Sequence, residues 1–85
     1  MKLDFENSQG YRRVIGTPDT VNEAFEIIRG FLQDHNYKSY YTRINFDDFE
    51  WEIDVGSHSE FFYLSDLNED TEKYKEEALG CTKEQ

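Results

Sequence analysis

The chain lacks most of the residues that staple a small fold or carry simple chemistry, with one cysteine, one proline and no long hydrophobic run in 85 residues. A membrane-spanning helix needs about 20 consecutive apolar residues, and no segment approaches that length. Residues 1–6 contain no secretory hydrophobic segment. A single cysteine cannot form an internal disulfide and fits a protein of the reducing cytoplasm. The five glycines are isolated from one another, which excludes a glycine-rich phosphate-binding loop.

Basic residues are scarce as well, since nine Lys and Arg stand against nineteen Asp and Glu and give a net charge of −10. The imbalance is confined to one half of the chain. Residues 1–46 hold six acidic and six basic side chains, whereas residues 47–85 hold thirteen and three. Such a surface repels nucleic acids and anionic membranes, so we expect neither direct nucleic-acid binding nor membrane binding. A one-sided acidic field favours a partner with a basic surface.

Aromatic residues are plentiful and make a small core feasible without disulfides. Fourteen of the 85 residues are Phe, Tyr or Trp, and each buries roughly 150–250 Å². The length allows one domain, residues 1–85, in which we expect residues 1–10 and 81–85 to be loose.

A periodic apolar stripe predicts one amphipathic helix. Apolar residues recur at spacings of three and four over residues 21–32, which places one helix face against a core. Two starts fit the sequence: Thr17-Pro18, which we prefer, or Thr20 with Glu23 completing a capping box. His35-Asn36 is the predicted end, because asparagine tolerates the left-handed conformation that closes helices.

Alternating patterns predict strands at residues 11–16, 37–46, 49–56 and 60–64, and a polar helix follows at residues 69–79, ended by Gly80. The order is β-α-β-β-β-α. We therefore predict an α+β fold, in which one antiparallel sheet has its helices packed on one face.

Two hairpins fix the predicted strand register. A two-residue turn at Asp47-Asp48 places Ile44 opposite Trp51 on the core side, although this turn lacks the glycine that such hairpins prefer. The next turn, around residue 57, places Phe62 beside Ile53. In both hairpins apolar side chains meet apolar side chains, which supports the pairing.

The outer face of the predicted sheet carries carboxylates interleaved with aromatic side chains. Glu50, Glu52 and Asp54 form an acidic row on one strand, and the neighbouring strands add tyrosine, phenylalanine and arginine. Aromatic residues are enriched at protein interfaces, and carboxylates complement a basic groove. The candidate partner-binding residues are Tyr41, Arg43, Asp47, Asp48, Glu50, Glu52, Asp54, Phe61 and Tyr63. The alternative is a solvated strand face whose charges oppose aggregation.

No catalytic, cofactor-binding or metal-binding residue is predicted, so we expect a protein that is not an enzyme. The nearest catalytic set is Asp54 with Ser57, His58 and neighbouring residues around one turn, and residues so close in sequence rarely converge. Two histidines and one cysteine match no zinc spacing, and no calcium-binding loop is present. Asp47-Asp48 with Glu50 would hold at most an adventitious cation.

Three segments carry a resemblance to a known group of proteins: residues 13–16, residues 39–41 and the run Asp54-Val55-Gly56-Ser57-His58-Ser59-Glu60-Phe61-Phe62. They resemble small, acidic, uncharacterised proteins of Gram-positive bacteria and of their phages and mobile elements. That family has no assigned activity, so the resemblance implies no functional residue. In type, the chain is similar to anti-CRISPR inhibitors and other DNA mimics of phage origin. This similarity implies carboxylates that occupy the nucleic-acid groove of another protein.

The order of elements from the first helix onward also resembles the double-stranded RNA-binding domain. That family begins its last helix with lysines, whereas this chain has acidic residues over 69–72, which excludes RNA binding. The sequence thus predicts a non-enzymatic, cytoplasmic interaction protein that blocks a basic surface of a nucleic-acid-handling protein. The alternative is a small soluble structural or subunit domain whose acidity serves only solubility.

Overall fold

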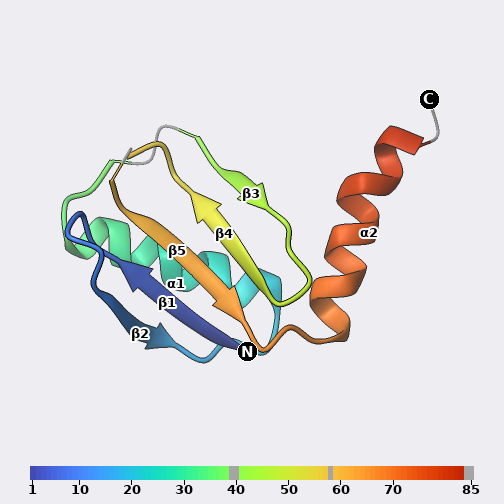
Figure 1. Cartoon of the computed structure of the whole chain (residues 1–85), viewed down its shortest axis with the longest axis horizontal. Coiled ribbons are helices and arrows are strands. Elements are labelled where there is room, and N and C mark those ends of the chain that lie inside the picture. The colour runs from blue at the N-terminus through green and yellow to red at the C-terminus, as the bar shows by residue number, and fades with distance from the viewer. Residues whose placement is uncertain (39–40, 58, 84–85) are drawn as a thin grey trace.

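A five-stranded antiparallel sheet and two helices make up the protein in the computed structural model, which describes residues 1–38, 41–57 and 59–83 (Figure 1). The elements are β1 (Lys2–Glu6), β2 (Arg12–Gly16), α1 (Val21–Asp34), β3 (Arg43–Asn45), β4 (Glu50–Asp54), β5 (Phe61–Ser65) and α2 (Glu69–Lys83). The strand order is β2-β1-β5-β4-β3, and every neighbouring pair is antiparallel. The predicted α+β class is confirmed, with one strand more than expected.

The additional strand is β1, which lies inside the sheet, paired with β2 on one side and β5 on the other. The prediction that residues 1–10 are loose is therefore wrong for residues 2–6. Leu3 and Phe5 point into the core and are 0% and 5% exposed. Two apolar residues give only a weak periodic signal in the sequence. The strand forms because it has a pairing partner on each side, which matters more than its own propensity. The Met1 ammonium donates to the Pro18 carbonyl at 2.8 Å and holds the start of the strand in place.

Helix α1 covers one face of the sheet. The Thr20 hydroxyl caps it by accepting a hydrogen bond from the Glu23 amide at 3.1 Å, so the Thr20 start is correct and the preferred Thr17-Pro18 start is wrong. At the other end Asn36 has φ of +56°, which confirms the predicted end of the helix.

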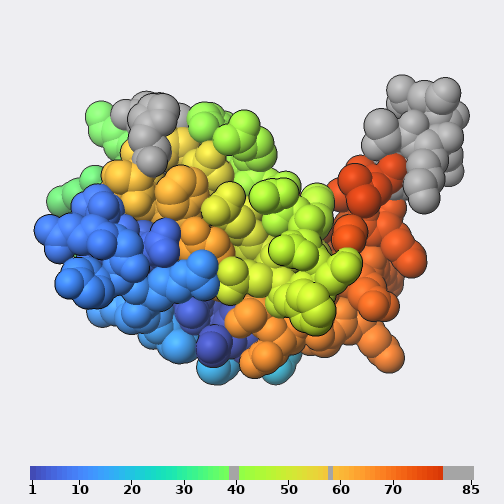
Figure 2. Space-filling view, viewed as in Figure 1, coloured from blue at the N-terminus to red at the C-terminus, as the bar shows by residue number. Residues whose placement is uncertain are grey.

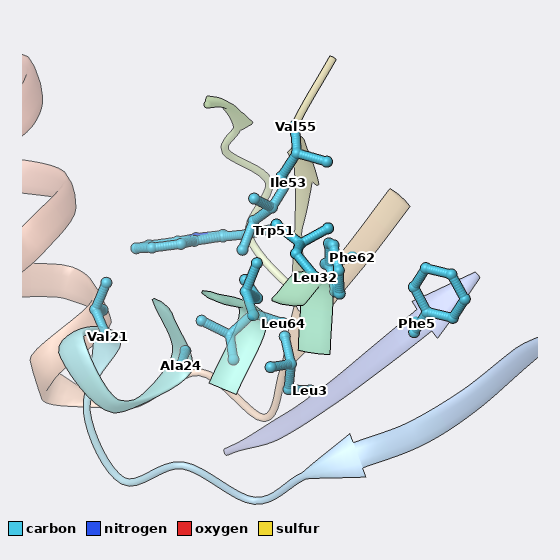
Figure 3. Packing of buried hydrophobic residues seen from close by; sticks show 11 residues of the cluster. Leu3, Phe5, Val21, Ala24, Leu32, Trp51, Ile53, Val55, Phe62 and Leu64 are labelled. Carbon is cyan, nitrogen blue, oxygen red and sulfur yellow. The ribbon is translucent and has the colours of Figure 1, made fainter. Parts of the chain in front are cut away.

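The core lies between α1 and the inner face of the sheet (Figure 3). Its buried side chains are Leu3, Phe5, Val21, Ala24, Ile28, Leu32, Trp51, Ile53, Val55, Phe62 and Leu64. In Figure 3 the Trp51 indole extends from β4 toward α2, where its ring centre lies 5.8 Å from that of Tyr74. The aromatic residues thus supply much of the core volume, as the composition indicates.

The β4–β5 register is as predicted, with Ile53 beside Phe62, whereas the β3–β4 register differs by two residues. Ile44 pairs with Ile53 and not with Trp51, because residues 46–49 form a four-residue loop in place of a two-residue turn. A shift of two keeps every side chain on its predicted face. Phe46 packs edge-on against Trp51, with ring centres 4.7 Å apart, which favours the observed register.

The strands around this loop are shorter than predicted. Strand β3 covers Arg43–Asn45 rather than residues 37–46, of which residues 39 and 40 lie outside the described part of the chain. Strand β4 begins at Glu50, so Phe49 belongs to the loop. Its predicted alternation with Trp51, Ile53 and Val55, which would turn Phe49 toward the core, is therefore wrong, and Phe49 is 83% exposed.

Helix α2 begins at an Asn68 cap, whose side-chain oxygen accepts from the Asp70 and Thr71 amides at 3.0 and 3.3 Å. It continues to Lys83, beyond the predicted end at Gly80, so residues 81–83 are helical rather than loose, and residues 84–85 lie outside the described residues. Its first half packs against the body through Tyr74, which contacts Trp51 and Phe25. Residues 76–79 are exposed, and Figure 1 shows α2 at the edge of the sheet beyond β3. Packing of both helices on one face is thus complete for α1 and partial for α2.

Candidate partner-binding surface

The outer face of the sheet, opposite α1, carries the predicted acidic row. Glu50, Glu52 and Asp54 alternate along β4 with the buried Trp51 and Ile53. In β5, Phe61 lies beside Asp54 and Tyr63 lies beside Glu52, as predicted. Arg43 on β3 pairs with Asp54 instead of Glu52 because of the register shift.

Each carboxylate of this row has a partner within the protein. Glu50 Oε2 lies 3.0 Å from Arg12 Nη1. Asp54 Oδ2 lies 3.1 Å from Arg43 Nη2, while its Oδ1 accepts from the Gly56 amide at 2.8 Å. The Tyr63 hydroxyl donates to Glu52 Oε2 at 3.2 Å. The acidic row is therefore less available to an external cation than its sequence indicates.

Tyr63 is at the centre of this network. Its hydroxyl also lies 3.2 Å from Glu6 Oε1, so one proton is shared between two carboxylates on either side. Burial of the phenol and the negative charges of Glu6 and Glu52 raise the pKa of Tyr63 to about 12. The Arg12 guanidinium carbon lies 3.5 Å from the centre of the Tyr63 ring, and the same guanidinium reaches Glu50 on the far side. Neutral tyrosine and charged arginine thus hold the carboxylates in place.

Two members of this network, Glu6 and Arg12, are absent from the predicted site. Glu6 belongs to β1, a segment predicted to be loose. Arg12 lies on β2 and reaches Glu50 on β4 across the two strands between them, β1 and β5. The alternation of Leu3 and Phe5 with charged residues over 2–6 is a weak signal for the missing strand. The outer face holds five acidic and three basic side chains, namely Asp4, Glu6, Glu50, Glu52 and Asp54 with Lys2, Arg12 and Arg43. Its charge is therefore nearly balanced.

A more acidic surface lies at the edge of the sheet, between the β3–β4 loop and the first turns of α2. A cleft of about 340 Å³ is lined there by Asp47, Asp48, Trp51, Leu67, Asn68, Glu69, Thr71, Glu72 and Lys75, and we name it the acidic cleft. In Figure 2 the loop lies against the base of α2. Four of the lining side chains are carboxylates and one is a lysine. Within the described part of the chain, none of these four carboxylates forms an ion pair.

Asp47 and Asp48 belong to the predicted site, whereas the contribution of α2 was not predicted from the sequence. Glu69 and Glu72 come next to the loop only because the Asn68 cap turns the chain at the end of β5. The neighbouring Asp70 faces the other way and has a structural role: its Oδ2 accepts from the Val21 amide at 2.7 Å, at the start of α1. The direction of these side chains depends on how α2 docks, which sequence spacing does not reveal.

Two exposed aromatic residues accompany the carboxylates. Phe49 directly follows Asp47 and Asp48 and is 83% exposed on the rim of the loop. Tyr41 precedes β3, is 46% exposed, and has the Arg43 guanidinium 5.9 Å from its ring centre. An exposed phenylalanine beside several carboxylates is the composition expected of an interface anchor.

The turn after β4 is held by local hydrogen bonds. The Ser57 hydroxyl accepts from the Glu60 amide at 3.0 Å and lies 2.9 Å from the Glu60 carbonyl, while Asp54 is paired with Arg43. His58, the remaining member of the catalytic set considered above, lies outside the described residues. Among residues 1–38, 41–57 and 59–83, no three His, Cys, Asp or Glu side chains are grouped so that they would hold a metal ion. Over the same residues, neither helix has the length and apolar character needed to cross a membrane.

Comparisons of this chain with protein-family models, curated proteins and solved structures give no match. The resemblance to small acidic proteins of Gram-positive bacteria and their phages stays a prediction.

Proposed function

We propose that the protein is a non-enzymatic interaction protein that blocks a basic surface of a nucleic-acid-handling protein, in the manner of phage-borne DNA mimics and anti-CRISPR inhibitors. The observation that carries the proposal is the acidic cleft, next to which the β3–β4 loop exposes Phe49. We further infer that the protein acts in the cytoplasm, because its single cysteine leaves it independent of disulfides.

We place the binding surface at the acidic cleft rather than on the outer face of the sheet, because the carboxylates of the cleft are the ones without a cation partner in the described residues. Carboxylates that already accept from arginine or tyrosine gain little from an external cation, because the existing bonds have to be exchanged for new ones. Glu50, Glu52 and Asp54 are in that state. Asp47, Asp48, Glu69 and Glu72 form no ion pair in the described structure. A cation of the partner can therefore bind them without breaking an existing ion pair.

The lining of the acidic cleft suits a lysine or arginine side chain from the partner. The half-buried Leu67 provides apolar surface for the methylene stem, and four carboxylates line the same cleft for the charged end, whereas Trp51 at its base is only 1% exposed. Proteins that bind nucleic acids present rows of such side chains to the phosphates. A groove built for phosphates therefore finds a comparable set of negative charges here.

Phe49 supplies what charge alone lacks. Electrostatic attraction accelerates encounter and selects partners, whereas buried aromatic anchors supply much of the affinity at interfaces. A phenylalanine that is 83% exposed becomes buried when a partner covers the loop. We expect the substitution Phe49→Ala to weaken binding by about tenfold or more, mainly through faster dissociation.

The test is affinity capture from a host lysate with three forms of the protein, each washed at low and at high salt. The cleft variant carries Asp47→Asn, Asp48→Asn and Glu72→Gln. The control carries Glu23→Gln, Glu26→Gln and Asp34→Asn, which remove the same charge from exposed positions on α1. We expect the wild type and the control to retain a nucleic-acid-binding protein that added DNA displaces, and the cleft variant to lose it.

Other outcomes decide against the proposal. Equal retention by all three forms would favour the alternative, a small soluble structural or subunit domain whose acidity serves solubility. Equal loss from both variants would mean that net charge alone, and no particular surface, governs binding. Capture that is unaffected by salt would also contradict the proposal, because ion pairs at an exposed surface weaken as salt rises.

A further inference from the structure

The end of the molecule opposite the acidic cleft carries an aromatic cleft with a cation on its wall. Its volume is about 270 Å³, its main lining residues are Phe5, Tyr11, Arg13, Phe31, His35 and Tyr37, and we name it the Arg13 cleft. It lies between the β1–β2 turn and the C-terminal end of α1. Figure 1 shows these two segments at one end of the molecule and the β3–β4 loop with α2 at the other.

Stacked rings make the Arg13 cleft a preformed platform. The His35 ring lies 4.1 Å from the Phe31 ring at 22°, and the Tyr37 ring lies 6.0 Å from His35 at 9°. The left-handed Asn36 reverses the chain so that Tyr37 returns over the helix end, where its amide donates to the Leu32 carbonyl at 2.9 Å. The platform is only partly covered, since Tyr37 is 39% exposed. An incoming aromatic ring therefore finds stacking partners without rearrangement.

Arg13 gives this cleft its charge preference. Its guanidinium carbon lies 5.6 Å from the Phe31 ring centre, and over the described residues it takes part in no ion pair. The adjacent Arg12 differs, because it is already bound to Glu6 and Glu50. The cleft thus offers stacked rings together with one available cation, and the matching ligand is an aromatic ring next to a carboxylate.

A segment of that chemistry is exposed at the opposite end of the same chain. Phe49 is 83% exposed and is directly preceded by Asp47 and Asp48. We propose that the Arg13 cleft binds this loop of a second copy of the protein, with Phe49 stacked on the platform and a loop carboxylate beside Arg13. The commitment to a second copy rests on this complementarity of charge and ring, both halves of which the chain itself provides.

The position of the two surfaces determines the kind of assembly. Because they lie at opposite ends, the contact is head-to-tail, and each copy keeps one unused loop and one unused cleft. Repulsion between chains of net charge −10 keeps the association weak. The inference goes beyond the proposed function and also limits it, since a loop held by a second copy is withdrawn from any basic partner.

Sedimentation equilibrium of the purified protein from about 10 μM to about 1 mM tests the proposal, since this range covers weak contacts of small area. We expect the average mass of the wild type to rise with concentration above 10.2 kDa. Arg13→Glu and Phe49→Ala each remove one half of the contact and remain monomeric. Arg29→Glu, which makes the same charge change at an exposed position on α1, associates as the wild type does.

A mixture of the two blocked variants gives the sharpest result. The Phe49→Ala chain keeps a working cleft and the Arg13→Glu chain keeps a working loop, so the mixture forms heterodimers and grows no further. A wild type that stays monomeric throughout overturns the proposal, as does a mixture that stays monomeric while the wild type associates. Because Arg13→Glu leaves the acidic cleft intact, it retains the basic partner of the proposed function, so the two proposals fail or succeed separately.

Discussion

The substitution Leu3→Ala tests the position of β1 inside the sheet, between β2 and β5. Leu3 is 0% exposed and lies between Gly16 on β2 and Leu64 on β5. Loss of a fully buried leucine side chain costs about 3–5 kcal/mol, through lost burial together with the cavity that remains. A domain of this length has a total stability of roughly 4–13 kcal/mol. We therefore expect the variant to lose a large part of its stability, with a fall in Tm of roughly 12 °C or more.

Leu79→Ala is the matched control, since it removes the same atoms from a leucine that is 44% exposed on α2. Its expected cost is within about 0.5 kcal/mol. The assay is urea unfolding followed by far-ultraviolet circular dichroism, with midpoints and slopes compared for the two variants and the wild type. Equal midpoints for the two variants would refute the placement of residues 2–6 as a strand between β2 and β5.

Three further expectations concern the backbone, the tyrosine network and the helix junction. Gly30→Ala raises the free energy of unfolding by about 0.5–1 kcal/mol in the same urea assay, because the added Cβ meets no atom within 4 Å. Gly10→Ala lowers it, because φ there is +87°. In an alkaline absorbance titration Tyr63 ionises near pH 12, and Tyr63→Phe removes that step. Folding raises this pKa from 10.0, so the stability that Tyr63 contributes is full below about pH 10 and is lost as pH rises toward 12. The same alkaline unfolding curve for the wild type and a Tyr63→Phe variant would contradict this. Asp70→Ala lowers the free energy of unfolding by about 1 kcal/mol, because the Val21 amide loses its charged acceptor, and an unchanged urea midpoint would argue against that bond.

Strong local patterns made α1 and the β4–β5 pair predictable from sequence. The helix stripe over residues 21–32 repeats for three turns, and the β4–β5 register places Ile53 against Phe62 without an alternative that keeps both buried. The length of the β3–β4 loop was predicted wrongly, as two residues rather than four. The number of residues in such a loop depends on which side chains pack beside it, and the sequence pattern does not show this. Here Phe46 packs on Trp51 and leaves Phe49 outside.

The candidate site was only partly predictable, for reasons of distance along the chain. Asp47 and Asp48 are local and were identified as candidates. The pairing of Arg12 with Glu50 joins residues 38 positions apart and requires that β1 and β2 be placed first. Once that ion pair and the one between Arg43 and Asp54 exist, the acidic row no longer has the charge that its residue types imply. Charge read from sequence is a total, and only the fold shows how much of it is already matched.

The position of β1 also affects how the chain folds. Lys2 pairs with Ser65, so the sheet is completed only by a contact across 63 positions. Without the β1–β5 ladder the chain falls into a β1–β2 hairpin and a β3–β4–β5 meander, neither of which buries its inner face alone. Formation of that ladder therefore joins two unstable halves in one step. The step carries the entropic cost of closing a long loop, which slows folding. During synthesis, the first strand made has to wait for the last strand before either is stable.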